Sequence, residues 1–240
     1  ALNDAQGPST EKPMAAVSII VPVLNEASVL VNFLENLQNL RCRECEVLVV
    51  DGGSHDASRE IAMPLADRVL TSAKGRAEQM NTGAREAGGD ILWFLHSDSV
   101  PPPNVDRLII DSFRQSDRAW GRFDVRLSGT HPLLRLIGMM MNIRSRLTGI
   151  ATGDQGIFVR RAAFEQVGGY ANIPLMEDIA LSRSLKRISR PICLRTRLIA
   201  SSRRWEKEGI HKTILIMWSL RLAYFLGVDP KRLARVYYGA

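Results

Sequence analysis

Short apolar runs alternate with amphipathic stretches along the first half of the chain. Runs of β-branched and aromatic residues that end at turn residues predict buried strands, whereas apolar side chains spaced by three and four predict helices. The predicted strands are residues 17–21, 46–50, 68–70 and 91–95, and the predicted helices are residues 26–40, 54–63 and 75–87. This alternation predicts an α/β fold with a mostly parallel central sheet flanked by helices.

The second half of the chain has a more mixed pattern. It predicts strands at residues 120–127 and 156–159, and helices at residues 105–113, 131–147, 162–167 and 177–189. Residues 210–226 are apolar and aromatic on a basic background. The nearest approach to a membrane span, residues 213–228, is interrupted by Arg221, so the sequence predicts a soluble or peripheral protein.

The two ends differ from the rest. Residues 1–13 are polar and unpatterned, which predicts a disordered leader or a tag remnant. We expect one catalytic domain over residues 14–228, because a single α/β core of this length needs no further support. Residues 229–240 are then expected to form a C-terminal tail.

Charge and cysteine content limit the classes of binding partner and the cellular compartment that the sequence favours. The chain of 240 residues has 32 Lys and Arg against 25 Asp and Glu, a net charge of +7 that suits nucleotide phosphates, an anionic membrane or nucleic acid. Its three cysteines form no disulfide framework, which favours a reducing, cytoplasmic location. Cys42 and Cys45 lead into a strand, an arrangement more typical of incidental thiols than of a redox or metal motif.

Polar residues gather where the predicted parallel strands end, the edge at which open α/β sheets bind ligands. They are Asn25 and Glu26 after the first strand, Asp51 and Gly53 after the second, and His96 and Asp98 after the fourth. Later motifs are Gly153-Asp154-Gln155-Gly156, Glu177-Asp178 and Ser202-Arg203-Arg204-Trp205.

In this order the motifs resemble those of the family 2 glycosyltransferases with the GT-A fold, over residues 17–226. Within them the chain is most similar to the radical-SAM/selenodomain-associated transferases. The resemblance implies an inverting enzyme that moves a sugar from a UDP- or GDP-sugar to the hydroxyl of a small or lipid-linked acceptor. With only the Arg204-Trp205 half of the motif of processive relatives, a single transfer is expected.

The resemblance also implies donor-binding roles. Pro22, Asn25, Glu26, Asp51 and Gly53 are expected around the base and ribose. Asp51 at a strand end would accept hydrogen bonds from ribose hydroxyls, although a turn or cap role is the alternative.

Phosphate and metal contacts come from other segments. Arg76 precedes a helix whose start suits phosphates, with a plain surface arginine as the alternative. Related enzymes hold Mg²⁺ or Mn²⁺ with an Asp-x-Asp, where this chain has His96-Ser97-Asp98. Asp98 is the expected ligand, His96 is either a weaker contact or a polar strand-end residue, and His211 is a further candidate ligand.

Displacement at the anomeric carbon requires a base for the acceptor hydroxyl. The resemblance implies that Asp178 is this base, against the alternative of two acids that favour a helix dipole. Asp154 and Gln155 are expected at the sugar or acceptor pocket, or in a plain turn. Arg204 is expected at the diphosphate and Trp205 against a sugar ring.

Several alternatives stay open. A nucleotidyltransferase would usually have a Gly-rich basic first loop, which residues 22–26 are not, and a non-catalytic nucleotide-binding module would not need Asp98 or Asp178. RNA binding is disfavoured because no aromatic platform accompanies the basic residues. Residues 139–146 and the tail mix apolar and basic residues, so core packing competes with contact with a membrane surface. A homodimer also stays open.

Overall fold

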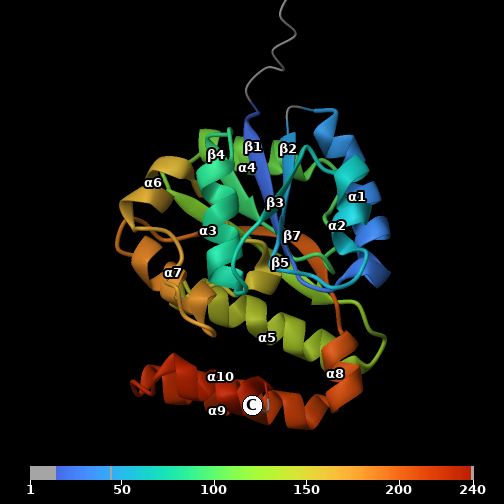
Figure 1. Ribbon diagram of the computed structural model, residues 1–240. Helices are drawn as coiled ribbons and strands as arrows, with labels where there is room; N and C mark the ends of the chain where they lie inside the picture. The colour runs from blue at the N-terminus through green and yellow to red at the C-terminus, as the bar shows by residue number, and fades with distance from the viewer. Residues whose placement is uncertain (1–14, 44, 239–240) are drawn as a thin grey trace, which may run out of the picture.

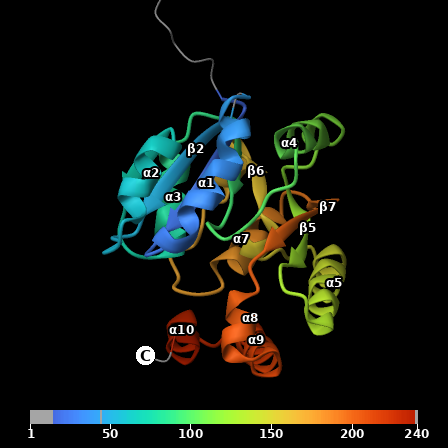
Figure 2. The same ribbon diagram turned by 90° about the vertical axis from the view of Figure 1, so that its right-hand side faces the viewer.

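The computed structural model describes residues 15–43 and 45–238 of the chain, which form a three-layered α/β arrangement with an additional helical layer below it (Figures 1 and 2). The expected leader, residues 1–13, lies outside the described residues. A single seven-stranded sheet has the strand order β3-β2-β1-β4-β6-β5-β7. Its strands are β1 (Val17–Val23), β2 (Cys45–Asp51), β3 (Arg68–Thr71), β4 (Ile91–Phe94), β5 (Trp120–Leu127), β6 (Phe158–Arg160) and β7 (Ile192–Ala200).

Strand directions confirm the prediction of a mostly parallel sheet. β3, β2, β1 and β4 are parallel to one another, β6 is antiparallel to both β4 and β5, and β7 is parallel to β5. The chain moves outward from β1 to β2 and β3, and then returns to place β4 on the other side of β1. This reversal is the topological switch point at which open α/β sheets form ligand clefts.

Helices cover both faces of the sheet because its central strands bury side chains on both sides. Ile19 and Val21 pack with the apolar face of α1, whereas Ile20 packs with α3 on the opposite face. The helices are α1 (Ala27–Arg41), α2 (Ser58–Leu65), α3 (Arg76–Glu86), α4 (Val105–Arg114), α5 (Pro132–Thr148), the 3₁₀ turn η1 (Gly153–Gln155), α6 (Arg161–Gln166), α7 (Glu177–Leu185), α8 (Arg203–Glu208), α9 (Ile210–Phe225) and α10 (Pro230–Tyr238).

One glycine sets how closely a helix approaches the sheet. A Cβ at Gly83 of α3 would lie 2.5 Å from Cγ2 of Ile20. The helix therefore packs directly on β1, which brings its first turn to the carboxyl ends of β1 and β2.

The structure adds elements that the sequence pattern did not predict. The sequence pattern missed β7 because charged side chains interrupt its apolar run. On this edge strand Arg195 and Arg197 are exposed and alternate with less exposed neighbours. The segment expected as a C-terminal tail contains α10, in which Leu233 and Ala234 are buried. Among the described residues, no helix combines the length and apolarity needed to cross a membrane.

Candidate active site

A cleft of about 730 Å³ lies beyond the carboxyl ends of β1 and β4. It is closed on its other sides by η1, the start of α7 and the helices α8, α9 and α10. The structure brings eight residues expected at the site to its lining: Pro22, Glu26, Arg76, Asp98, Asp154, Asp178, Arg204 and Trp205. Segments more than 150 residues apart in the sequence therefore meet in one place.

Asn25 stabilises one side of the cleft without lining it. It has a left-handed backbone with φ of 55°. Its backbone N–H donates to Ser54 Oγ at 2.9 Å, and its side-chain Oδ1 accepts from the backbone N–H of His55 at 2.8 Å. These bonds join the loop after β1 to the loop after β2, so Asn25 fixes the position of its neighbour Glu26 in the cleft.

Asp51 and Gly53 have a similar bracing role in the second loop. Asp51 is buried, and its carboxylate accepts from the backbone N–H groups of Gly53 and Ser54 at 3.1 Å. Gly53 adopts φ of 90°, a conformation that favours glycine. Neither residue is among those that line the cleft.

Arg76 is the first residue of α3 and lines the cleft together with Lys74, Gly75 and Gln79. The buried Gln79 side chain donates 2.8 Å hydrogen bonds to the carbonyl oxygens of Val23 and Val50, which holds this helix start at two strand ends. A helix N-terminus with a guanidinium and an ammonium beside it is an arrangement suited to an anionic group.

His96 and Asp98 follow β4, and Arg203, a motif residue to which the sequence assigned no role, reaches Asp98. Nη2 of Arg203 lies 3.5 Å from Oδ2 of Asp98 and 3.4 Å from Oε2 of Glu26. Nδ1 of His96 lies 3.8 Å from Oδ1 of Asp154. Burial, and then the positive charge of Arg76, lower the pKa of His96, which favours a neutral imidazole with a free lone pair.

These side chains suit a divalent cation that is held partly by the protein and partly by the oxygens of a bound phosphate. Asp98 is partly exposed in the cleft, and Asp154 and the neutral His96 supply further donors nearby. Mg²⁺ is commonly held by one or two carboxylates together with substrate phosphates. A cage made only of protein ligands is not present, because no group of three or more His, Cys, Asp or Glu residues suited to a metal occurs within residues 15–43 and 45–238.

Asp178 lies at the start of α7, where two backbone donors fix its carboxylate. Oδ2 accepts from the N–H of Gly153 at 2.8 Å, and Oδ1 accepts from the N–H of Ile179 at 2.7 Å. A Cβ at Gly153 would lie 2.6 Å from Nε2 of His96, so η1 approaches the end of β4 as closely as a glycine allows. The carboxylate thus keeps a fixed orientation in the cleft while one lone pair on each oxygen stays available.

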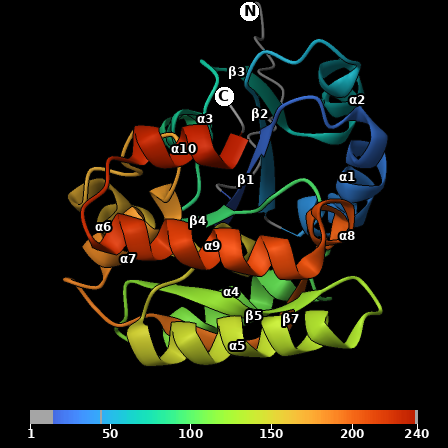
Figure 3. The ribbon, with the colours of Figure 1, turned by 90° about the horizontal axis from the view of Figure 1, so that it is seen from below.

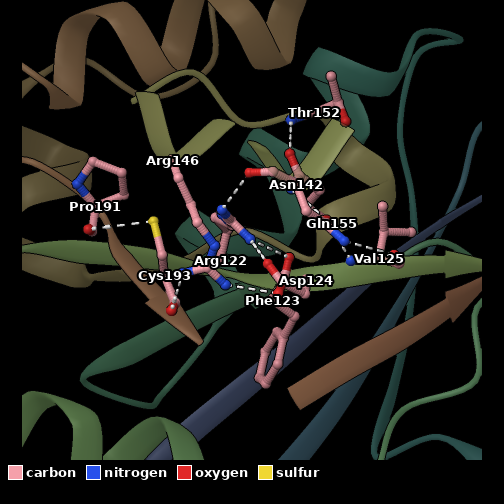
Figure 4. A network of polar contacts seen from close by, with 10 residues as sticks. All are labelled: Arg122, Phe123, Asp124, Val125, Asn142, Arg146, Thr152, Gln155, Pro191 and Cys193. Carbon is pink, nitrogen blue, oxygen red and sulfur yellow. Dashed lines mark hydrogen bonds and ion pairs between the residues drawn. The ribbon is translucent and has the colours of Figure 1, made fainter. Parts of the chain in front are cut away.

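A buried polar network supports η1 from behind (Figure 4). Gln155 is fully buried and accepts from the backbone N–H of Thr152 at 3.3 Å. Asn142 of α5 pairs with Val125 of β5 through bonds of 2.8 and 3.0 Å. In the same network the carboxylate of Asp124 on β5 pairs with the guanidinium groups of Arg122 and Arg146. Gln155, expected to line a sugar pocket, instead holds the turn that presents Gly153 to Asp178.

Glu177 is a buried acid in the cleft wall that sequence reasoning did not place at the site. Burial, and then the negative charge of Asp178, raise the pKa of Glu177 to about 7. In the sequence, Glu177 and Asp178 form an acid pair at a predicted helix start, and the resemblance assigned a role only to Asp178.

Folding therefore favours the protonated form of Glu177, and the free energy of unfolding should fall as pH rises from about 4.5 to about 7. Glu177→Gln mimics that protonated form. We expect the variant to be more stable than the wild type at pH 8 by about 1–3 kcal/mol, with little difference at pH 4. Chemical denaturation across this range checks the result, with the exposed Glu165→Gln as control. Equal pH slopes for wild type and Glu177→Gln would contradict it.

The cleft is completed by aromatic residues of the last helices. The guanidinium of Arg204 stacks over the ring of Tyr237 at 3.7 Å, which ties α8 to α10. Trp205 lines the cleft and packs against the apolar cluster between α5 and β5. Tyr237 and Tyr238, in the segment expected as a tail, also line the cleft. No pattern in the sequence indicated that these tyrosines return to the site.

His211 is exposed on the first turn of α9 and is not among the residues that line the cleft. Thr213 and Met217 of the same helix line the cleft, so His211 is not on the side of α9 that faces it.

Comparison with known proteins places this cleft in a family context. Residues 18–168 match the model of glycosyl transferase family 2. The chain is 24% identical to a probable glycosyltransferase of Bacillus subtilis, YdaM, over 90% of this chain and 56% of that protein. It is 28% identical to the undecaprenyl-phosphate 4-deoxy-4-formamido-L-arabinose transferase of Pseudomonas paraeruginosa over 62% of this chain and 47% of that protein. The chain thus spans about half the length of these relatives.

Solved structures show the same fold at low sequence identity. Glucosyl-3-phosphoglycerate synthase from Mycobacterium tuberculosis, in complex with Mn²⁺, UDP and glucosyl-3-phosphoglycerate, aligns with a TM-score of 0.60 at 18% identity, covering 78% of this chain and 71% of the synthase. A mannosyltransferase from Pyrobaculum calidifontis, in complex with GDP-Man and Mn²⁺, aligns with a TM-score of 0.57 at 19% identity, over 77% of this chain and 56% of the other. The expected GT-A fold is confirmed.

Proposed function

The chain belongs to glycosyl transferase family 2, and from that premise we propose that it moves a sugar from a UDP- or GDP-sugar to an acceptor hydroxyl with inversion, in a single transfer. The observation that carries the proposal is the cleft, in which Asp178 and Asp98 stand among the basic residues Arg76 and Arg204. The family match favours sugar transfer over nucleotidyl transfer. Membership of the radical-SAM/selenodomain-associated subgroup rests on the sequence resemblance and stays a prediction.

In the proposed reaction Asp178 takes the proton of the acceptor hydroxyl. The acceptor oxygen forms a bond to the anomeric carbon as the bond to the diphosphate oxygen breaks on the opposite face, which inverts the configuration. Backbone N–H groups hold both oxygens of Asp178, so the base needs no reorientation as it accepts the proton. Arg76, at the start of α3, is suited to the departing diphosphate.

A bound Mg²⁺ or Mn²⁺ would stabilise the charge of the leaving group, and Asp98 is the residue proposed to hold it, with His96 or Asp154 beside it. Support comes from the Mn²⁺ in the complexes of the two solved relatives. Those relatives also motivate the proposed donors, since their complexes contain UDP and GDP-Man. The undecaprenyl-phosphate relative motivates a lipid-linked acceptor beside a small one.

A screen of nucleotide sugars tests the proposal. With Mn²⁺ present and ligand about 100-fold above Kd, the matching donor should raise Tm by roughly 5–10 °C and be slowly hydrolysed. Nucleoside triphosphates with sugar 1-phosphates form the comparison arm. Turnover in that arm alone would indicate nucleotidyl transfer, and stabilisation by no nucleotide sugar would count against the proposal. Once an acceptor is found, NMR of the product should show the anomeric configuration opposite to that of the donor.

Gln155→Met tests whether the buried network positions the base. The substitution keeps the volume of the side chain but removes the acceptor of the Thr152 N–H, which loosens the turn that holds Asp178. We expect kcat to fall by up to about 10²-fold with the donor Kd unchanged, because misplacement of about 1 Å has effects of this size. A donor Kd that weakens in parallel with kcat would indicate general unfolding of the cleft.

A further inference from the structure

Exposed apolar side chains are concentrated on one face of the molecule, formed by α5, α9 and α10. Figure 3 shows these helices side by side across the lower face of Figure 1. The large hydrophobic residues exposed there are Leu136, Met139, Met140, Ile143, Leu147, Leu215, Trp218, Leu222, Phe225, Leu226 and Val236, and Tyr238 at the end of α10 is exposed beside the cleft. Elsewhere in the described parts of the chain such residues are scattered, as Val31, Met63, Val100 and Ile188. A contiguous group of this kind marks an interaction surface.

The two sides of α9 face different environments. Met217 and Leu220 lie on the side that lines the cleft. Leu215, Trp218 and Leu222 lie on the opposite side and are 71%, 60% and 61% exposed. From Leu215 to Phe225 the outward side is largely apolar, and it has no partner within the described chain that would explain this composition.

Positive charge is concentrated in the same segments. Residues 132–148 contain three arginines and no acids, and residues 203–238 contain eight Lys and Arg against three Asp and Glu. The excess in these two segments is larger than the net charge of +7 of the entire chain, so the remainder is close to neutral. Not all of these side chains reach the outer surface, because Arg146 pairs with Asp124 and both Arg204 and Arg221 line the cleft. The exposed ones include Arg135 on α5, Lys212 on α9, and Lys231, Arg232 and Arg235 on α10.

We propose that this face, called the basal face and formed by the outward sides of α5, α9 and α10, docks on an anionic membrane surface. Apolar side chains that include a tryptophan would enter the headgroup region while the flanking basic residues meet lipid phosphates. Docking would place the cleft about one helix diameter, roughly 10 Å, from the lipid, because α9 separates the two. The inference goes beyond the proposed function, since vesicle binding requires neither donor nor transfer.

Charge decides between this partner and a second copy of the chain. In a two-fold symmetric dimer through the basal face, the same patch meets itself. The exposed basic residues, which are Arg135, Lys212 and the three of α10, would then oppose like charges, which is unfavourable, whereas an anionic surface complements them. The composition of the face therefore favours lipid over self-association.

Co-sedimentation with vesicles tests the inference. The chain should bind vesicles of phosphatidylglycerol and phosphatidylcholine but bind pure phosphatidylcholine far less, and binding should weaken as salt rises. Binding should also shift the emission of Trp218 to shorter wavelength, a change absent in Trp218→Phe. The double variant Trp218→Glu/Leu222→Glu should lower the partition coefficient at least about tenfold. Met63→Glu, at a residue 57% exposed on α2, is the matched control and should bind as the wild type does.

A second variant keeps the result interpretable if the double variant folds poorly. Lys231→Glu/Arg235→Glu changes only exposed side chains of α10 and should also reduce binding to anionic vesicles. Absence of wild-type binding to these vesicles would overturn the inference. So would binding that both variants retain, or a wild-type dimer that Trp218→Glu/Leu222→Glu separates without any vesicle binding. Nucleotide binding, measured without vesicles, reports separately on the proposed function.

Discussion

Replacing Asp178 by asparagine is expected to lower kcat by about 10²–10⁴-fold while the donor Kd stays nearly unchanged. Asparagine keeps the shape of the side chain and its oxygen can still accept from the backbone N–H of Gly153. It cannot take the proton of an acceptor hydroxyl. The loss therefore falls on the chemical step and not on assembly of the cleft, and single-turnover kinetics with a matched donor and acceptor measures it.

The neighbouring acid provides the matched control. Glu177→Gln changes a carboxyl group one position away, on the same turn of α7. We expect it to retain most of kcat, because its carboxyl group has no hydrogen bond to η1 in the structure and, with a pKa of about 7, is mostly protonated below that pH, as glutamine mimics. Full activity in Asp178→Asn combined with inactivity in Glu177→Gln would move the role of base to Glu177.

Asp98→Asn is expected to raise the Mn²⁺ concentration for half-maximal activity by at least about 10–100-fold. The substitution removes the negative charge that the proposed cation requires, while the amide fits the same space. Since the pair that Asp98 makes with Arg203 is partly exposed, its loss should change the free energy of unfolding by no more than about 1 kcal/mol. A titration of activity with Mn²⁺, alongside thermal unfolding, measures both effects.

The variant Arg203→Ala tests whether Asp98 acts as a metal ligand or only as the ion-pair partner of Arg203. If Asp98 acts only by holding Arg203, then Arg203→Ala should reproduce the loss seen in Asp98→Asn. We expect the opposite result, in which Arg203→Ala needs the same or less Mn²⁺, because a competing cation has been removed from Oδ2 of Asp98. Equal metal dependence in wild type and Asp98→Asn would rule out the proposed ligand.

The sequence predicted the first half of the fold well because its strands are buried on both faces and read as continuous apolar runs. Their carboxyl ends were therefore located correctly, and with them the cleft residues Glu26 and Asp98. The order of the motifs then indicated Asp178. Edge strand β7 escaped prediction because its alternating arginines interrupt the apolar pattern.

Local pattern was less informative about which polar residue faces the cleft. Asn25, Asp51 and Gln155 were expected to contact a ligand, and in the structure their side chains hold backbone N–H groups of the surrounding loops. Arg203 and Tyr237 reach the site only through the way α8 and α10 return to the sheet. Such contacts depend on the tertiary packing of segments that lie far apart in the chain. The periodicity of apolar residues indicates only local structure and cannot predict them.

Calorimetry of UDP and GDP binding, with and without Mn²⁺, tests the central claim most directly. The arrangement of Arg76, Arg204 and Asp98 around one cleft predicts that at least one of these nucleotides binds with one-to-one stoichiometry. It also predicts that Mn²⁺ tightens binding in the wild type and has little effect in Asp98→Asn. Binding of neither nucleotide, with Mn²⁺, with Mg²⁺ or without metal, would contradict the assignment of this cleft as a nucleotide-sugar site.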